Sequence, residues 1–324
     1  MREFVIGPND AGQRMDKYLF KLLKNAGSGL IFKQLRNKNI VLNGCKSKGS
    51  EILKEQDIVK IFMADDTIDK FMGKNNTEDL ADCNLNIKII YEDENIILAD
   101  KPVGVLSQKA KSSDVSMNEF IASHYSQLGQ KDNSTFKPAF CNRLDRNTSG
   151  LMIGGVSLKG LQKMSEILRD RSLQKYYLAI VIGKLEGKSL INGYLCKDEK
   201  TNQVTVRDRE FEGSAAIHTE YEGLAYNNGL SLIKVHLITG KTHQIRAHLA
   251  YIGYPILGDQ KYGDASVNSK YHVNSQMLHS YEVIFPKMLD EFTDISEKSF
   301  HTDFPKRFKK YFTMGRSKWL SQEG

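Results

Sequence analysis

The chain has 324 residues and a net charge of +7, from 46 lysines and arginines against 39 aspartates and glutamates. This length predicts two domains, and 40% hydrophobic with 26% charged residues is ordinary for a soluble globular protein. No run of about 18 apolar residues is present, so we expect no membrane-spanning helix. The first residues lack a signal-peptide pattern, and we expect a cytoplasmic protein. The four cysteines are at least 38 residues apart, which excludes a CxxC zinc ribbon and disfavours a disulfide framework.

Positive charge is concentrated at the beginning of the chain. Residues 1–62 contain 12 lysines and arginines and 6 acids, for a net charge of +6. Residues 65–84 contain 6 acids and 2 bases, and this polar stretch has few apolar residues, which is typical of a linker. We therefore predict a small basic domain over residues 1–63, an acidic linker over 64–84 and a large domain over 85–324.

The small domain is predicted to contain two helices followed by strands. Apolar residues with helical spacing from Met15 to Leu23 predict the first helix, and Ser28 is a candidate N-cap for the second. Strands are predicted at 40–42 and 58–62, with a tight turn at Asn43-Gly44. A solvated helix face would explain scattered lysines, but it explains less well why basic residues gather here. The basic residues on the second helix and near the turn are candidates for contacting a polyanion: Lys33, Arg36, Lys38 and Lys46.

The large domain is predicted to be α+β, because strands and helices alternate without a regular βαβ period. Several strands alternate apolar and polar residues, which favours a large, mixed, mainly antiparallel sheet. Helices are expected to begin at Ser116, where Glu119 completes a capping box, at Ser157, and after Thr242. The predicted strands are Ile87–Tyr91, Ile96–Ala99, Leu151–Gly154, Tyr176–Ile182, Gln203–Arg207, Ala216–Tyr221 and Leu230–Ile238.

The segment with the densest functional groups is Cys-Asn-Arg-Leu-Asp-Arg-Asn-Thr-Ser-Gly at residues 141–150. Asp145 lies between Arg143 and Arg146, and nearby positive charges favour the ionised form of a carboxylate. We expect Asp145 to be charged at neutral pH, which suits a nucleophile or an ion-pair partner and not a general acid. Taken alone, such a segment is more often a surface turn with a structural ion pair.

A second segment, Thr-Gly-Lys-Thr-His-Gln-Ile-Arg, places cations near a predicted helix N-terminus. Because the helix dipole disfavours cations there, Lys241 and Arg246 indicate a nearby anion, either a phosphate or the carboxylate of Asp145. His243 and His248 are five residues apart and do not share a helix face as the histidines of HExxH do. With no CxxC nearby, we expect no metal site.

Three further segments are prominent. Lys175–Gly183 predicts a strand with Tyr176 on one face and Tyr177 on the other, although a strand tyrosine is usually a core residue. Ala99–Leu106 contains Lys-Pro-Val-Gly after a strand, and Gly253–Asp259 reads Gly-Tyr-Pro-Ile-Leu-Gly-Asp.

Together and in this order, the segments resemble the RluA family of RNA pseudouridine synthases, in the branch that has an N-terminal S4 RNA-binding domain. The family's H-R-L-D-x-x-T-S-G pattern matches residues 142–150, with Asn142 in place of histidine. Its T-G-R-T-H-Q-I-R-x-H-L pattern matches residues 239–249, with Lys241 in place of arginine. The remaining patterns, K-x-Y-x-A, K-P-x-G and G-x-P-I-L-G-D, match residues 175–179, 101–104 and 253–259.

The resemblance implies a role for each matching residue. Asp145 would be the catalytic aspartate, Tyr177 the active-site tyrosine, and Arg246 the partner of the aspartate. Arg143 would enter the RNA stack in place of a flipped-out uridine, because the target atoms are hidden in stacked RNA. Leu237, at the end of its strand, is a candidate apolar wall for the base. The basic residues of the small domain would contact RNA.

The implied reaction isomerises specific uridines in RNA to pseudouridine. The expected substrate is large-subunit (23S) ribosomal RNA or its precursor. The reaction needs no cofactor, in agreement with a sequence that lacks GxGxxG and P-loop motifs. Whether Asp145 attacks C1′ of the ribose or C6 of the base stays open, and we expect a monomer. Two alternatives are a non-catalytic S4-type ribosome-assembly factor and a nucleoside or glycoside hydrolase. Hydrolases of that kind normally pair two carboxylates, and these motifs offer one.

Overall fold

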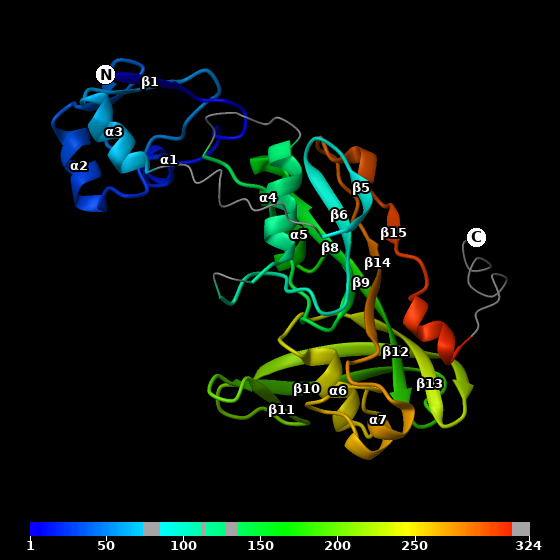
Figure 1. Ribbon diagram of the computed structural model, residues 1–324. Helices are drawn as coiled ribbons and strands as arrows, with labels where there is room; N and C mark the ends of the chain where they lie inside the picture. Colours follow the sequence, from blue (N-terminus) through cyan, green and yellow to red (C-terminus); the bar gives the residue numbers. More distant parts are fainter. Residues whose placement is uncertain (74–84, 112–113, 128–134, 313–324) are drawn as a thin grey trace.

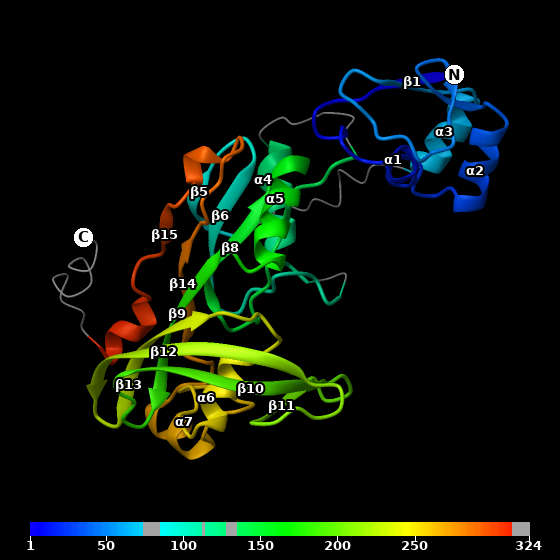
Figure 2. The same cartoon turned by 180° about the vertical axis from the view of Figure 1, so that it is seen from behind.

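The computed structural model describes residues 1–73, 85–111, 114–127 and 135–312. A four-stranded sheet lies near the N-terminus, and an eleven-stranded sheet with helices on its faces lies in the larger part of the chain that follows. The small N-terminal domain stands beside the large one in two opposite views (Figures 1 and 2). None of the described helices is both long enough and apolar enough to cross a membrane.

The small domain contains the two helices and the strands that the sequence predicts. Asn43 and Gly44 both have positive φ, as the tight turn requires. Its core includes the fully buried side chains of Met15, Leu19 and Ile61. The assignment as an S4-type domain stays a prediction. The sheet order is β1-β4-β2-β3, and the elements are β1 Arg2–Val5, α1 Met15–Leu22, α2 Ser28–Arg36, β2 Ile40–Leu42, β3 Cys45–Lys46, β4 Ile58–Ile61 and α3 Asp65–Met72.

Two details of this region differ from the sequence prediction. Ser28 is the first residue of α2 and not its cap, because Gly27 occupies the N-cap position without a side-chain hydrogen bond. Residues 65–72, predicted to be linker, form helix α3, whose Ile68 is fully buried in the core of the small domain. The acidic residues made this segment resemble a linker. Two of them, Asp65 and Asp66, lie in the first turn of α3, where the helix dipole favours negative charge. The rest of the predicted linker, residues 74–84, lies outside the described residues.

The large sheet is mainly antiparallel, as predicted, and its one parallel pairing among the described strands joins β8 to β14. All seven predicted strands are present, and the sequence reasoning missed four others, of which β10 and β14 are the longest. The path runs β11-β10-β12-β13-β9-β14-β8-β6-β5, with β15 beside β14 and β7 beside β8. The strands are β5 Lys88–Glu92, β6 Ile96–Lys101, β7 Ala139–Phe140, β8 Ser149–Gly155, β9 Gln174–Ile182, β10 Lys188–Asp198, β11 Gln203–Arg207, β12 Ala215–Asn227, β13 Leu230–Leu237, β14 Leu278–Ile284 and β15 Ser299–His301.

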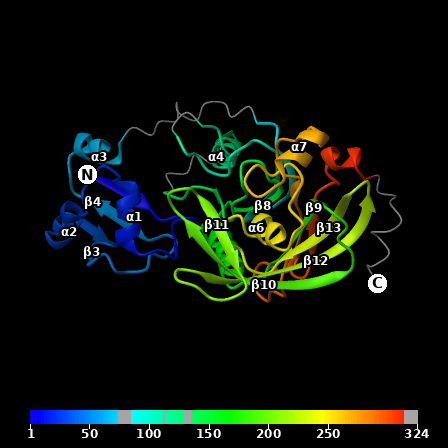
Figure 3. The same ribbon diagram turned by 90° about the horizontal axis from the view of Figure 1, so that it is seen from below.

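Helices pack on both faces of this sheet because successive strand residues point to opposite sides. Ile97 of β6 shares a core with Ile121 of α4, whereas its neighbour Ile96 shares another core with Met164 of α5. Helix α6 packs against β10, β11 and β12 through Ala247 (Figure 3). The helices are α4 Met117–Gln127, α5 Leu158–Arg169, α6 Gln244–Tyr251 and α7 Ala265–Tyr271, with 3-10 turns at Thr293–Ile295 and Lys306–Lys310.

A close contact between strands fixes the start of β8. Gly150 has φ +111°, and a Cβ atom there would lie 2.1 Å from the carbonyl oxygen of Ser280 on β14. Only glycine allows this approach. The contact anchors the end of the loop between β7 and β8, which carries Asp145.

Candidate active site

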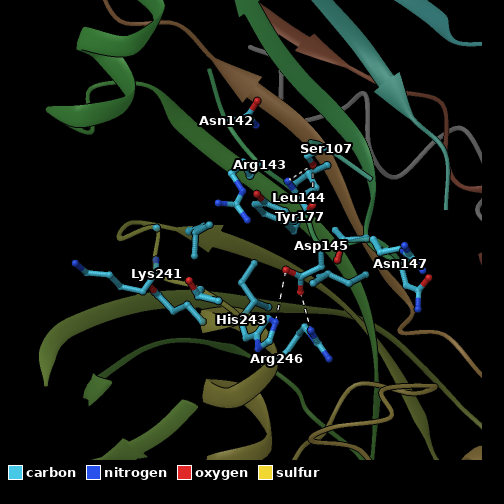
Figure 4. Close-up of a pocket in the computed structure, with 18 of the residues that line it drawn as sticks. Ser107, Asn142, Arg143, Leu144, Asp145, Asn147, Tyr177, Lys241, His243 and Arg246 are labelled. Carbon is cyan, nitrogen blue, oxygen red and sulfur yellow. Dashed lines mark hydrogen bonds and ion pairs between the residues drawn. The ribbon is translucent and has the colours of Figure 1, made fainter. Parts of the chain in front are cut away.

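Three separate parts of the chain meet at one cavity of about 1220 Å³. Asp145 comes from the loop between β7 and β8, Tyr177 from β9, and Arg246 from α6. Figure 4 shows the Asp145 side chain pointing toward Arg246 and His243. The structure therefore brings together residues that are up to 101 positions apart in the sequence.

The two oxygens of the Asp145 carboxylate have different surroundings. Oδ2 accepts a hydrogen bond from Nη1 of Arg246 at 2.7 Å. Oδ1 accepts no hydrogen bond from any described residue, and Nε2 of His243 lies 3.9 Å from it. The side chain is 29% exposed. One oxygen is thus anchored and the other is free on the cavity side, as a nucleophile or base requires.

Arg246 is held by a second, fully buried carboxylate that the sequence reasoning did not single out. Asp259 accepts hydrogen bonds from Nε and Nη2 of Arg246 at 2.6 and 2.8 Å, in the bidentate geometry that suits a guanidinium. It also accepts the backbone N–H groups of Lys261 and Tyr262. Burial alone would raise the pKa of Asp259, but the hydrogen bonds and charge of Arg246 lower it. The guanidinium is therefore held between the carboxylates of Asp145 and Asp259.

His243 stands beside Oδ1 of Asp145 without forming a hydrogen bond to it, since Nε2 is 3.9 Å away. It has a left-handed backbone at the N-cap of α6, and its Nδ1 lies 3.0 Å from the hydroxyl of Tyr262. Burial lowers the pKa of His243, and the charge of Asp145 only partly offsets this effect. The ring is therefore neutral at pH 7.

The loop that carries Asp145 is held by two residues at and after the end of β6, Lys101 and Ser107. Ser107 donates its hydroxyl to the carbonyl of Leu144 at 2.8 Å and accepts the N–H of the same residue at 3.0 Å. The fully buried Lys101 donates Nζ to the carbonyls of Val105 and Arg146, at 2.7 and 3.0 Å. Burial lowers the pKa of Lys101 to about 7, against the opposing charge of Asp145. Lys101 and Ser107 thus position the loop from both sides of Asp145.

Tyr177 and Tyr176 point to opposite faces of β9, as predicted. Tyr177 is 6% exposed and lines the cavity, whereas Tyr176 stacks on His236 with ring centroids 4.6 Å apart. Burial raises the pKa of Tyr177 to about 12, against a side-chain hydrogen bond with Ser280. The phenol is therefore neutral at pH 7, and its ring forms an apolar wall.

The other predicted residues of the large domain also line the cavity. Arg143 is exposed on its rim, and Leu237 at the end of β13 is half-buried (Figure 4 labels Arg143). Asn142 accepts the backbone N–H of Ile153 through Oδ1 at 2.9 Å. This bond ties the loop to β8, so the asparagine supports the loop.

The cavity is strongly basic. Among its described lining residues, Asp145 is the single acid, so the wall attracts anions. The basic lining residues are Lys109, Arg143, Arg146, Arg169, Arg171, Lys175, Lys197, Lys241, Arg246 and Lys261.

The basic residues predicted on the small domain lie elsewhere, on its surface. Lys33, Arg36, Lys38 and Lys46 are all exposed. Arg36 and Lys46 line a second pocket of about 550 Å³, together with the partly exposed ring of Phe32. An aromatic ring beside cations suits a nucleic-acid contact.

The chain is similar to known RNA pseudouridine synthases. A family model described as RNA pseudouridylate synthase matches residues 95–251. An uncharacterised RNA pseudouridine synthase of Mycoplasma genitalium is 34% identical over 88% of this chain and 90% of its own length. The ribosomal large subunit pseudouridine synthase D of Borreliella burgdorferi is 31% identical over 95% of this chain and 90% of its own length. A ribosomal large subunit pseudouridine synthase C from Haemophilus ducreyi is 28% identical over 89% of each chain.

Solved structures show the same fold. The human RNA pseudouridylate synthase domain containing 1 superposes with a TM-score of 0.56 at 19% identity, covering 72% of this chain and 91% of the human one.

Proposed function

Because the chain belongs to the RluA family of RNA pseudouridine synthases, and is therefore an isomerase acting on RNA, we propose that it modifies uridines of large-subunit ribosomal RNA. The names of the relatives from Borreliella and Haemophilus support this substrate class. The basic cavity supports it as well, because a folded RNA is a polyanion.

The observation that carries the proposal is the asymmetric carboxylate of Asp145. Pseudouridine formation breaks the N1–C1′ bond of uridine, turns the uracil and forms a C5–C1′ bond. An ionised carboxylate starts this reaction, either at C1′ or at C6. The hydrogen bond from Arg246 to Oδ2 orients the group, while Oδ1 accepts no hydrogen bond from the described residues and can reach the nucleotide.

The uridine must leave its RNA stack to reach Asp145, since the carboxylate lies within the cavity. We infer that Arg143, on the rim, fills the vacated place with its planar guanidinium. Tyr177 and Leu237 then supply apolar walls for the uracil. Because the phenol of Tyr177 is neutral at pH 7, we assign it to packing against the base and not to proton removal in its ionised form.

We infer that the small domain is an S4-type module that anchors RNA away from the reacting uridine. Its pair of helices, its Asn43-Gly44 turn and its exposed bases support this role. The alternative of a non-catalytic assembly factor is not favoured, because Asp145, Tyr177 and Arg246 are all present and converge on one cavity.

The proposed chemistry is tested with large-subunit ribosomal RNA transcribed in vitro from uridine tritiated at C5. The C5 hydrogen is lost to solvent when the C5–C1′ bond forms, so tritium release measures turnover. Asp145→Asn should lower turnover by roughly 1000-fold or more while leaving RNA binding largely intact. Asp294→Asn, at an exposed acid on a distant 3-10 turn, is the matched control and should behave like wild type. Activity retained by Asp145→Asn would refute the assignment.

A further inference from the structure

Two of the bases that line the cavity are buried, Lys175 and Arg246, and of these only Arg246 has an ion-pair partner among the described residues. Lys175 lies on β9 two positions before Tyr177, so both side chains point to the same face of the strand. It lines the cavity and is only 9% exposed. Within the described part of the chain, no hydrogen bond or ion pair reaches its ammonium group.

This isolation is unfavourable for the free protein. Burying an ammonium group without a partner costs free energy, because its hydration is lost and nothing replaces it. Burial lowers the pKa of Lys175, and the positive charge of Arg171 lowers it further. Lys101, the other buried lysine beside this cavity, has carbonyl acceptors. The ammonium of Lys175 therefore lacks the compensation that the protein provides elsewhere.

Space remains beside this ammonium group. A Cβ atom on Gly240 would lie 3.9 Å from Nζ of Lys175, and the glycine leaves that position empty. Asp145, the single acid among the described lining residues, forms its ion pair with Arg246 and not with Lys175. An anion bound in the cavity would supply the missing counter-charge.

A second cation is placed beside Lys175 at a conformational cost. Arg171 follows Asp170, the C-cap of α5, and has φ +66°, in the left-handed region that glycine prefers after a helix. It lines the same cavity. Two adjacent cations repel each other in the free protein, and an anion between them would relieve both.

We propose that Lys175, assisted by Arg171, binds one phosphate of the RNA backbone beside the flipped uridine. This inference rests on the proposed function of the cavity. A strand rises about 3.3 Å per residue, so Lys175 lies about 7 Å along β9 from Tyr177, a distance that one nucleotide spans. A phosphate fits better than a uracil carbonyl, because a neutral group would leave the repulsion between two cations uncompensated.

The test uses a short synthetic RNA centred on the uridine that the wild-type protein modifies in large-subunit ribosomal RNA. Each neighbouring phosphate is replaced in turn by a neutral methylphosphonate. In the wild type, neutralising one particular phosphate should raise KM by about 10- to 100-fold, the usual effect of losing a charge-assisted hydrogen bond. Lys175→Met should raise KM by a similar factor with kcat little changed, and it should be insensitive to that same replacement. Lys175→Arg should restore most of the affinity.

Lys287→Met, at an exposed lysine outside the cavity, is the matched control and should leave KM and its response to each methylphosphonate unchanged. Additive effects of Lys175→Met and methylphosphonate at every position would overturn the proposal. The proposal would also be overturned if Lys175→Met had the same KM as the wild type on an RNA that the wild type modifies. That result would leave the proposed function of the cavity intact. Free Lys175→Met should melt at the same or a higher temperature than wild type. A lower melting temperature would mean that Lys175 serves the fold and not a ligand.

Discussion

Removing Asp259 is the perturbation that most directly tests how Arg246 is held. Asp259 is 1% exposed and forms two hydrogen bonds to Arg246, which is itself only 6% exposed. Asp259→Ala leaves the buried guanidinium with Asp145 as its remaining carboxylate partner. Breaking a buried ion pair by removing one partner costs about 3–5 kcal/mol, mostly because the other charge stays buried and uncompensated.

This loss should be visible in thermal unfolding. For a domain of this size, 1 kcal/mol corresponds to a shift in Tm of about 2–4 °C, so Asp259→Ala should lower Tm by roughly 6–20 °C. Unfolding followed by circular dichroism measures the shift. Catalysis should fall as well, because a freed Arg246 no longer orients Asp145. At temperatures below the Tm of the variant, where it is folded, we expect kcat for tritium release to be about 100-fold lower than in the wild type, with a smaller change in KM.

The pH dependence of the stability gives an independent check. The pKa of Asp259 is lowered in the folded protein, so its contribution is present above the unfolded pKa of about 3.9 and is lost as pH falls through the folded value. The difference in unfolding free energy between wild type and Asp259→Asn should therefore be constant near neutral pH and shrink below about pH 4. A loss for Asp259→Ala below about 1 kcal/mol, together with unchanged kcat, would refute this role for Asp259.

Three further variants test the loop, the strand contact and the small domain. Ser107→Ala removes both hydrogen bonds to Leu144, and we expect kcat to fall by about 10-fold in the tritium assay; an unchanged kcat would show that the loop holds without this brace. Gly150→Ala forces a Cβ into a backbone atom 2.1 Å away and should sharply lower Tm, whereas Gly27→Ala, with no atom within 4 Å, should not; equal Tm values would contradict the close contact. Neutralising Arg36 and Lys46 together should reduce the slope of log K against log salt for RNA binding by about 1–2, and an unchanged slope would place the RNA elsewhere.

The sequence predicted those strands whose inward residues are apolar, and it missed strands that lack this pattern. Strand β14 contains His279 and Ser280, which are both buried but polar, so no apolar alternation is visible. The ring of His279 is satisfied by Ser149 and Thr302, partners that only the folded chain brings near. Strand β10 fails for the opposite reason, since most of its residues are at least partly exposed.

Helix α3 was missed because its composition is ambiguous. Eight residues with three aspartates look like solvated linker, and only the burial of Ile68 against the first domain reveals a packed helix. Short helices gain most of their stability from such tertiary contacts.

The candidate site was partly visible in the sequence. Asp145, Tyr177 and Arg246 were singled out because their surrounding motifs resemble a known family. Asp259 and Lys175 also lie in these motifs. The residues around Asp259 in the sequence do not indicate that its carboxylate is buried or that it binds Arg246. The isolation of the Lys175 ammonium is likewise a property of the assembled cavity, so it needed the three-dimensional structure.

The most direct test of the proposed function is a map of pseudouridines in large-subunit ribosomal RNA from cells that lack this protein. We predict that one or a few positions lose pseudouridine, that the wild-type gene restores them, and that a gene with Asp145→Asn does not. An unchanged map, or full restoration by the Asp145→Asn protein, would contradict the proposal that Asp145 drives uridine isomerisation in this RNA.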